Sequence, residues 1–242
     1  GSKEAYRNGE QPYGRTTMQR DVRWTNFNTL TWKQKVKKHN YDVMLGHEVS
    51  YKSTEYLLGE AMGFPFDQME NDNMGLGATP SKVESTYYDK TLLSFYARAN
   101  YNYDNRYLFT ATVRADGSTV FSSNKKWGFF PSFSAAWRVS EEAFMKDIKW
   151  ISNFKIRLGW GTVGNDNIPN YLSLDLYEAN KYGIGNSSVT VLNPKQLRNK
   201  NLKWEGSNTT NLGIDLGFFD NRLNLTAEFF IKNTKDLSLI HI

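Results

Sequence analysis

Residues 93–115 read LSFYARANYNYDNRYLFTATVRA, and this stretch decides the fold class. On both sides of Asp104-Asn105-Arg106, apolar side chains occupy the odd positions and mostly polar side chains occupy the even positions. Because successive side chains of a strand point to opposite faces, each side predicts a strand with one apolar and one polar face. The polar residues between them predict a tight turn, so 93–103 and 107–115 should form an antiparallel hairpin.

The same unit recurs along the chain. The further pairs of predicted strands are 24–32 with 41–51, 129–139 with 154–160, and 212–218 with 222–231. Aromatic residues make up 15% of the 242 residues and stand among Thr, Val, Gly and Asn in short blocks, a composition that favours strands over helices. The sequence therefore predicts an all-β, antiparallel fold of about eight strands in four hairpins.

The connections between the predicted strands alternate in length. Turns inside the hairpins are mostly short, whereas the links between hairpins, at 59–91, 116–127 and 164–203, are long and rich in Gly, Asn, Ser and Pro. A transmembrane β-barrel has short turns on its periplasmic side and long loops outside. Several strands also approach the roughly 9–11 residues that cross a membrane. We therefore expect a partial transmembrane β-barrel, with a soluble extracellular glycan-binding β-sandwich and a passive porin as the alternatives.

Charged side chains fall on the polar face of the predicted strands. The residues that we expect to face the lumen of a barrel are Arg98, Arg114, Arg157, Asp215 and Glu228. On the other face they would meet lipid, where a charge is destabilising. Tyr101, Tyr103 and Tyr107 cluster beside a turn, where the interfacial aromatic girdle of a barrel would lie.

The residue inventory argues against catalysis and against nucleic-acid binding. The chain has no cysteine, which excludes disulfides and thiolate sites, and its net charge of +5 is spread along the sequence. None of the three histidines stands near a nucleophile motif. Glu141-Glu142 could suggest acid–base chemistry, but Ser140 before them favours a helix N-cap. We therefore expect no enzyme activity, no cofactor, no metal site and no nucleic-acid partner.

Some residues of the predicted loops could bind a metal ion or a sugar. Asn165-Asp166-Asn167 and Glu70-Asn71-Asp72-Asn73 offer oxygen ligands of the kind that Ca²⁺ prefers, yet neither has EF-hand spacing, so plain polar loops are favoured. The loop aromatics that could stack on sugar rings, or else anchor loops by packing, are Tyr177, Tyr182, Phe64 and Phe66. The sequence therefore offers candidate binding residues in these loops but assigns no binding site to them.

One series of motifs is specific. RADGST at 114–119 leads to NKKWGFFPS at 124–132, and then to Trp137 and SEEAF at 140–144. This series resembles the C-terminal barrel of SusC/RagA-type TonB-dependent outer-membrane transporters, in which R-x-D-G-S-S, N-R-W-G-x-F-P-S and W-x-x-S-E-E follow one another. The signature residues, for which we expect structural roles, are Arg114, Asp116, Gly117, Ser118, Trp127, Gly128, Pro131, Ser132, Trp137, Gly164, Asn165, Trp204 and Glu205.

The resemblance implies an outer-membrane barrel of about 22 strands with a plugged lumen. Residues 1–236 would form part of that barrel. The resemblance also implies import of oligosaccharides or peptides, a SusD-like surface lipoprotein as partner, contact with outer-membrane lipid, and energy from TonB-ExbB-ExbD through an N-terminal part that this chain lacks. Alone, the chain would transport nothing.

Two further expectations concern single positions. Gly117 and Gly128 should supply positive φ, while Trp127 and Trp137 should anchor strand ends at the membrane surface. The last six residues, LSLIHI at 237–242, match the translation of a transposon end used to build sequencing libraries. We therefore expect 237–242 to be sequencing-adapter read-through.

Overall fold

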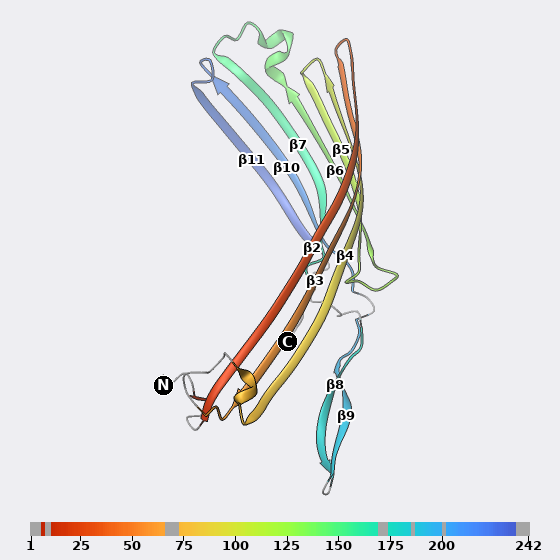
Figure 1. Ribbon diagram of the computed structural model, residues 1–242. Helices are drawn as coiled ribbons and strands as arrows, with labels where there is room; N and C mark the ends of the chain where they lie inside the picture. Colours follow the sequence, from red (N-terminus) through yellow and green to blue (C-terminus); the bar gives the residue numbers. More distant parts are fainter. Residues whose placement is uncertain are drawn as a thin grey trace. The chain divides into compact units, whose positions relative to one another are not determined.

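Strands dominate the computed structural model, which describes residues 6–7, 11–65, 73–168, 174–184, 187–199 and 202–235 (Figure 1). The strands are β1 (Tyr6–Arg7), β2 (Gln11–Val36), β3 (His39–Met62), β4 (Thr79–Tyr103), β5 (Tyr107–Ser118), β6 (Trp127–Arg138), β7 (Ile151–Asn165), β8 (Leu176–Ile184), β9 (Ser187–Gln196), β10 (Glu205–Phe218) and β11 (Leu223–Lys235). Short 3-10 helices in these parts are η3 (Met74–Leu76), η4 (Val139–Glu141) and η5 (Ala143–Met145). Within the described ranges, no helix is long and apolar enough to span a membrane.

The long strands pair in the order in which they follow along the chain. The main sheet has the order β1-β2-β3-β4-β5-β6-β7-β10-β11, and β8 and β9 form a two-stranded sheet of their own. The eight predicted strands correspond to β2 to β7, β10 and β11, with the predicted hairpin partners. The all-β, antiparallel prediction is therefore confirmed, and the barrel is not closed within this chain.

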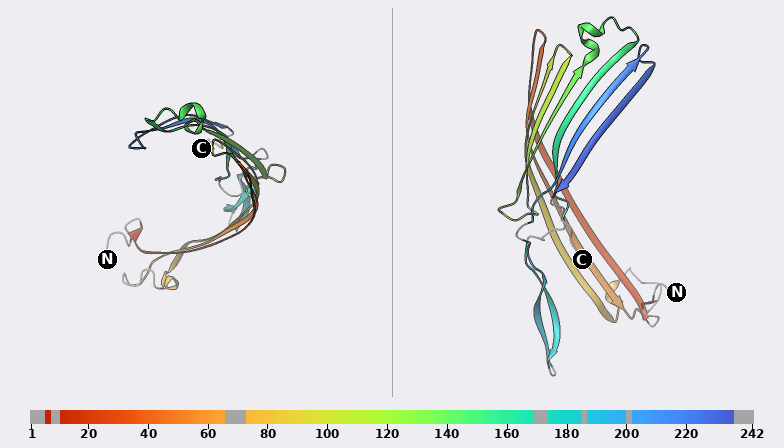
Figure 2. Two further views of the ribbon diagram at one scale, coloured as in Figure 1. Left: turned by 90° about the horizontal axis from the view of Figure 1, so that it is seen from above. Right: turned by 180° about the vertical axis from the view of Figure 1, so that it is seen from behind.

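The chain divides into two compact units. Unit 1 comprises Gly1–Trp24 and Tyr51–Lys90, and unit 2 comprises Thr25–Ser50 and Thr91–Ile242. Strands β2, β3 and β4 contribute residues to both units, whereas β5 to β11 belong to unit 2. In unit 2, the strands β5, β6, β7, β10 and β11 lie side by side from every viewpoint (Figures 1 and 2).

One face of the unit 2 sheet is apolar across all of its neighbouring strands. The cross-strand register places these residues in one row: Tyr101, Phe109, Ala135, Leu158, Leu212 and Phe229. On this face Phe95, Phe109 and Phe229 are 49%, 39% and 64% exposed. A closed sandwich would bury these rings between its two sheets, so the sandwich alternative is wrong. We call this exposed surface the apolar band.

Tight turns join the strands at one end of unit 2. Asp104 and Asn105 have φ values of 52° and 57°, and Asp220 and Asn221 have values of 54° and 60°. Consecutive left-handed residues match the twist of a hairpin, and Asp and Asn tolerate this region better than most side chains. The predicted turns are thereby confirmed. We call this end of unit 2 the turn end, and the opposite end, which carries 119–126, 166–168 and 202–204, the loop end.

Unit 1 contains parts of three unusually long strands and a small core. Strands β2, β3 and β4 have 26, 24 and 25 residues, whereas about 9–11 residues cross a membrane. Leu58, Ala61 and Phe64 are buried. Near them, Nε of Arg15 lies 3.7 Å from Oε1 of Glu60. Unit 1 thus has a small core of its own.

Two of the predicted long loops contain strands. Because β3 runs to Met62 and β4 begins at Thr79, the predicted loop 59–91 is wrong over about half of its length, at 59–62 and 79–91. Residues 79–91, TPSKVESTYYDKT, carry no apolar alternation, so the pattern that predicts strands is absent there. The predicted link 164–203 contains the hairpin β8–β9, and the link 116–127 is shorter than predicted, since β5 ends at Ser118.

Candidate functional site

On the polar face of unit 2, Asp215 holds Arg157 in a fork. Nε of Arg157 lies 2.8 Å from Oδ2 of Asp215, and NH2 lies 3.1 Å from Oδ1. Glu228 adds a second carboxylate at 3.8 Å, and the hydroxyl of Thr226 donates to Asp215 at 3.2 Å. Since paired N–H groups of an arginine match a carboxylate in geometry, this arrangement orients both side chains. The cluster links β7, β10 and β11.

Gly213 provides the space that this fork needs. It stands directly opposite Arg157 in the register of β7 and β10. A Cβ atom added at Gly213 would lie 2.9 Å from Cζ of Arg157. The guanidinium therefore crosses β10 over a glycine to reach Asp215, and any larger residue at this position would displace it.

A second cluster surrounds Arg114 of β5. Nε of Arg114 lies 2.7 Å from Oδ1 of Asp116, and NH2 lies 3.2 Å from Oε2 of Glu48 and 2.8 Å from Oγ of Ser94. The guanidinium also stands over the ring of Tyr96, 5.4 Å from its centroid, in cation–π geometry. Asp116 and Ser94 are buried. These contacts join β3, β4 and β5 on the polar face.

The remaining predicted charged residue, Arg98, makes a weaker contact. Its Nε donates to the hydroxyl of Thr112, its cross-strand partner, at 3.4 Å. Arg98 stands between Ala97 and Ala99, whose side chains point to the apolar face. Four of the five residues predicted to line a lumen thus belong to two ionic clusters, and Arg98 contacts Thr112 outside them.

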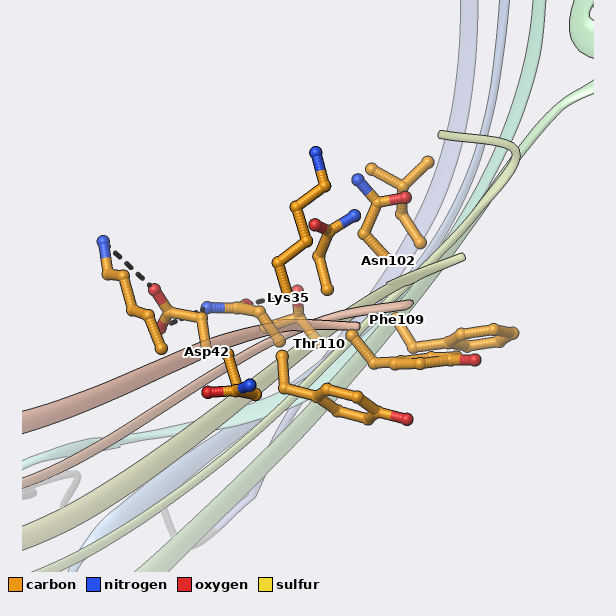
Figure 3. Close-up of a pocket in the computed structure, with 12 residues that line it drawn as sticks. Lys35, Asp42, Asn102, Phe109 and Thr110 are labelled. Atoms are coloured by element: carbon orange, nitrogen blue, oxygen red, sulfur yellow. Dashed lines mark hydrogen bonds and ion pairs between the residues drawn. The ribbon is translucent and has the colours of Figure 1, made fainter. Parts of the chain in front are cut away.

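A cluster of polar side chains that the sequence reasoning missed lies near the turn end of unit 2 (Figure 3). Nζ of Lys33 lies 3.3 Å from Asp42, Asn100 donates to Asp42 at 3.4 Å, and the hydroxyl of Thr110 donates to Asn100 at 2.8 Å. Figure 3 shows Lys35 and Asp42 on one side of the strands and Phe109 on the other. Asp42, Asn100 and Thr110 stand between apolar neighbours in the sequence, as Arg98 does. The same alternation would therefore have predicted that they lie on the polar face.

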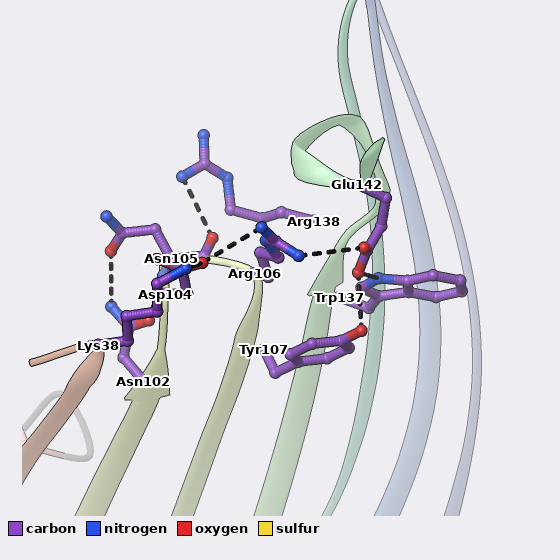
Figure 4. Close-up of polar contacts among 9 residues, drawn as sticks. All are labelled: Lys38, Asn102, Asp104, Asn105, Arg106, Tyr107, Trp137, Arg138 and Glu142. Carbon is purple, nitrogen blue, oxygen red and sulfur yellow. Dashed lines mark hydrogen bonds and ion pairs between the residues drawn. The ribbon is translucent and has the colours of Figure 1, made fainter. Parts of the chain in front are cut away.

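Side chains from three connections meet at the turn end (Figure 4). Nζ of Lys38 lies 2.8 Å from Asp104, and Arg106 bridges Asp104 at 3.2 Å and Glu142 at 3.4 Å. These ion pairs connect the turn 37–38 to the turn 104–106, and that turn to the connection 139–150. The Lys38 ammonium holds the pKa of the Asp104 carboxyl below its usual range.

The prediction for Ser140 and the two glutamates is wrong. Ser140 lies inside the 3-10 helix η4, whose N-cap is Arg138, and the N-cap of η5 is Glu142. Neither cap side chain makes a capping hydrogen bond. Glu142 instead accepts hydrogen bonds from the hydroxyl of Tyr107 at 2.7 Å and from Nε1 of Trp137 at 3.1 Å. These two donors, with the Arg106 charge, lower the pKa of Glu142. Its role is therefore to fix the connection to the strands.

Trp204 and several other signature residues lie at the loop end of unit 2. Nε1 of Trp204 donates to the carbonyl of Lys126 at 2.9 Å, and its ring packs on Phe121 and Phe130 with centroids 5.1 and 5.3 Å apart. Val120, Phe121 and Leu202 are buried together, with Ile168 packed against them. This group, which we call the loop cluster, fixes both ends of the excursion that contains β8 and β9.

Close ring packing, not positive φ, explains the signature glycines. Among the described glycines only Gly63 has a positive φ, so the prediction for Gly117 and Gly128 is wrong. A Cβ atom at Gly164 or Gly128 would collide with the ring of Phe130, and one at Gly117 would lie 3.1 Å from the indole of Trp127. Bulkier residues would block these contacts, because the rings lie directly on the backbone.

The other signature residues occupy regular positions of the strands. Ser118 is fully buried, and Pro131 and Ser132 lie in β6 opposite Val113 and Thr112. Asn165 is paired with Glu205 across β7 and β10, and its side chain accepts the backbone N–H of Asn167 at 3.0 Å. That hydrogen bond agrees with a plain polar loop.

The loop aromatics proposed to stack on sugars differ in how far their side chains are exposed. Phe64 is buried in unit 1, so the sugar-stacking interpretation is wrong for it, whereas Tyr177 and Tyr182 are exposed on β8. Phe66, the carboxylates of 70–72 and the tail 237–242 lie outside the described residues. In the described parts of the chain, no group of three His, Cys, Asp or Glu side chains is placed to hold a metal ion.

Comparison with known proteins decides the family. The family described as "TonB dependent receptor-like, beta-barrel" matches residues 2–239. The chain belongs to the TonB-dependent receptors. Its similarity to SusC and to the RagAB peptide transporter confirms the resemblance to the SusC/RagA type. The family is one of outer-membrane receptors and transporters and not a class of enzymes.

Relatives of this receptor chain come from two bacteria. It is 34% identical over 210 residues to TonB-dependent receptor P3 of Formosa agariphila, which covers 87% of this chain and 21% of that protein. It is 42% identical over 152 residues to TonB-dependent receptor SusC of Bacteroides thetaiotaomicron, covering 61% of this chain and 15% of that protein. The chain thus spans about a fifth or less of the length of these relatives.

Solved structures agree with the fold. The structure of the RagAB peptide transporter matches with a TM-score of 0.83 and 27% identity, over 91% of this chain and 24% of that chain. The RagAB peptide importer in its "open-open" state matches equally well, over 93% of this chain and 25% of that chain. This TonB-dependent receptor chain therefore has the barrel-wall fold of a larger transporter.

Proposed function

We propose that this chain forms part of the barrel wall of an outer-membrane importer that takes up oligosaccharides or peptides. The observation that carries the proposal is the apolar band, exposed on one face of strands whose other face carries paired charges. Strands that separate lipid from a water-filled lumen have this two-faced character. Similarity to SusC and to the RagAB peptide transporter supports the class of cargo.

The lumen side of the proposed barrel wall carries the charged clusters. We assign to it Arg98, Arg114, Arg157, Asp215 and Glu228. Support comes from the fork between Arg157 and Asp215 at 2.8 Å and the contact of Arg114 with Asp116 at 2.7 Å, which keep these charges partnered. In this position they can meet the solute or the plug of the intact protein, whereas on the other face they would meet lipid.

The loop end is the proposed docking site of a SusD-like surface lipoprotein that acts as a lid. The loop cluster supports this role, because Leu202 and Ile168 hold the base of the β8–β9 excursion while Tyr177 and Leu192 stay exposed on the hairpin. A hairpin alone in water is marginally stable, so a fixed base and an outside partner both fit its exposed side chains. Energy for import would come through TonB-ExbB-ExbD, as family membership suggests.

Uptake by the intact receptor in cells with and without TonB tests the proposal. The strain with TonB should accumulate labelled oligosaccharide or peptide, and the strain without TonB should lose this uptake while the receptor stays in the outer membrane. Equal uptake in both strains would contradict active import and favour the passive porin. Membrane levels of the receptor serve as the control.

A further inference from the structure

The connection 139–150 between β6 and β7 is fixed over the apolar face at both of its ends. At its start, Glu142 accepts hydrogen bonds from Tyr107 at 2.7 Å and Trp137 at 3.1 Å. Tyr107 and Trp137 stand opposite each other in the register, in the row next to the one that contains Phe109. The acidic side chain therefore reaches toward the aromatic residues of the apolar face, and not toward the polar face.

The far end of the same connection makes an aromatic contact. Trp150 stacks on Phe218 of β10, with ring centroids 5.8 Å apart and planes at 7°. The backbone N–H of Phe219 donates to the carbonyl of Trp150 at 3.0 Å, which ties the connection to the neighbouring turn. Because Phe218 follows Leu216 and Leu212 at even positions of β10, Trp150 also sits beside the apolar face.

Between these two fixed points the connection exposes a mixture of aromatic and basic side chains. Phe144 is 62% exposed and Trp150 is 54% exposed. Lys146 and Lys149 are exposed as well. Among the described residues neither lies within ion-pair distance of a carboxylate, although the charge of Lys146 contributes to the lowered pKa of Asp104. Glu141 and Glu142, in contrast, are paired with Arg138 at 3.1 Å and with Arg106 at 3.4 Å.

We infer that residues 139–150 form a membrane-interface anchor, in which Phe144 and Trp150 lie at the boundary of acyl chains and headgroups and Lys146 and Lys149 bind the phosphate of anionic phospholipids. Aromatic rings favour this boundary, and lysines near it are attracted to anionic headgroups. Residues 139–150 carry a net charge of −1. Since Glu141 and Glu142 are paired with Arg138 and Arg106, the remaining Lys146, Asp147 and Lys149 sum to +1, so the rings carry part of the attachment. The inference rests on the proposed function, because it requires the barrel to stand in a bilayer.

A fluorescent probe on a cysteine tests the position of the anchor in the intact receptor, purified and reconstituted in vesicles. The variants are Phe144→Cys, with the probe on the connection, and Leu158→Cys, with the probe in the middle of the apolar band. A quencher carried near the lipid headgroups should quench the probe at 144, and a quencher deep in the acyl chains should quench the probe at 158. A water-soluble quencher should reach neither probe well.

Headgroup chemistry is tested in the same preparation. Spin-labelled phosphatidylglycerol should quench the probe at 144 more than spin-labelled phosphatidylcholine does, with a preference of roughly fivefold for each lysine engaged. The double variant Lys146→Gln/Lys149→Gln should abolish the preference. Lys125→Gln, at the loop end, removes an exposed positive charge elsewhere and should leave it unchanged. The probe at 158 in each background reports whether the barrel is inserted.

The outcomes separate the two proposals. Quenching from water at 144, with lipid quenching intact at 158, would overturn the anchor and leave the barrel standing; it would mean that the connection is free for a periplasmic protein. Equal quenching by both lipids would overturn the phosphate contact. Quenching from water at both positions would overturn the barrel wall itself, and with it the proposed function.

Discussion

Arg157 and Asp215 form a two-point ion pair across neighbouring strands, with N–O distances of 2.8 and 3.1 Å, and the guanidinium reaches this partner over the bare backbone of Gly213. A pair that depends on one missing methyl group is sensitive to a small substitution. The polar face of unit 2 therefore offers a test in which nothing but steric space is changed.

Gly213→Ala should displace the Arg157 guanidinium and weaken its fork with Asp215. Both side chains are partly exposed, so we expect a loss of about 1 kcal/mol in the free energy of unfolding of the intact receptor. Urea unfolding in detergent, followed by tryptophan fluorescence, measures it. Gly206→Ala is the matched control, because it lies in the same strand and a Cβ there meets nothing within 4 Å. Equal effects of the two variants would rule out the steric explanation.

Gly164→Ala should disturb the loop cluster. The added methyl group would collide with the ring of Phe130, which packs on Trp204. Overpacking of this kind typically destabilises by about 1–3 kcal/mol. We expect faster proteolytic cleavage within 119–126, measured against the unchanged receptor and against Gly206→Ala. Unchanged cleavage in both variants would show that the ring packing does not restrain this loop.

The attachment of residues 139–150 should depend on pH. Hydrogen bonds from Tyr107 and Trp137 lower the pKa of Glu142, so its contribution is fully present above the ordinary glutamate pKa. It is lost as the pH falls through the lowered pKa of Glu142. Hydrogen exchange of 139–150 should therefore rise in acid while the strands stay protected. In Glu142→Gln the rise should be absent; a rise of the same size there would point to another group.

Deleting 170–198 should weaken lid docking or uptake while the barrel still assembles. This stretch contains β8 and β9, which form a sheet apart from the main one. Loops are much less coupled to a fold than strands are. Copurification of the surface lipoprotein and the heat-modifiable mobility of the receptor measure the two effects separately. Loss of the assembled form would show that the excursion is part of the barrel wall instead.

How much the sequence predicts depends on whether a strand has one apolar face. Around Phe95 and Phe109 the alternation is regular, and the predicted strands and turns agree with β4 and β5. Residues 79–91 have no such face, so alternation predicts a loop there, although they form the first part of β4. The hairpin β8–β9 was missed for a similar reason: Gly183 and Pro194 interrupt it in the way that loop residues do.

For the candidate site, too, the sequence predicts the face on which a residue lies but not its contacts. Alternation assigned Arg157 and Asp215 to the polar face, but which charges meet depends on the register between β7 and β10. The partners of Glu142 come from two different strands and a connection, a combination that no local pattern contains. The predicted positive φ of Gly117 and Gly128 is wrong, because the rings that pack on these glycines come from positions that a local pattern does not contain.

The central claim, that one face of these strands meets lipid and the other meets water, is tested most directly at two adjacent residues. Ala111 lies on the apolar face and Thr112 on the polar face of β5, paired with Ala99 and Arg98. In the intact receptor, freed of other cysteines, Ala111→Cys should resist a water-soluble maleimide and react with a lipid-soluble one. Thr112→Cys should react with the water-soluble reagent once the lumen is open to it. Rapid labelling of Ala111→Cys from water, in a correctly assembled receptor, would contradict the account.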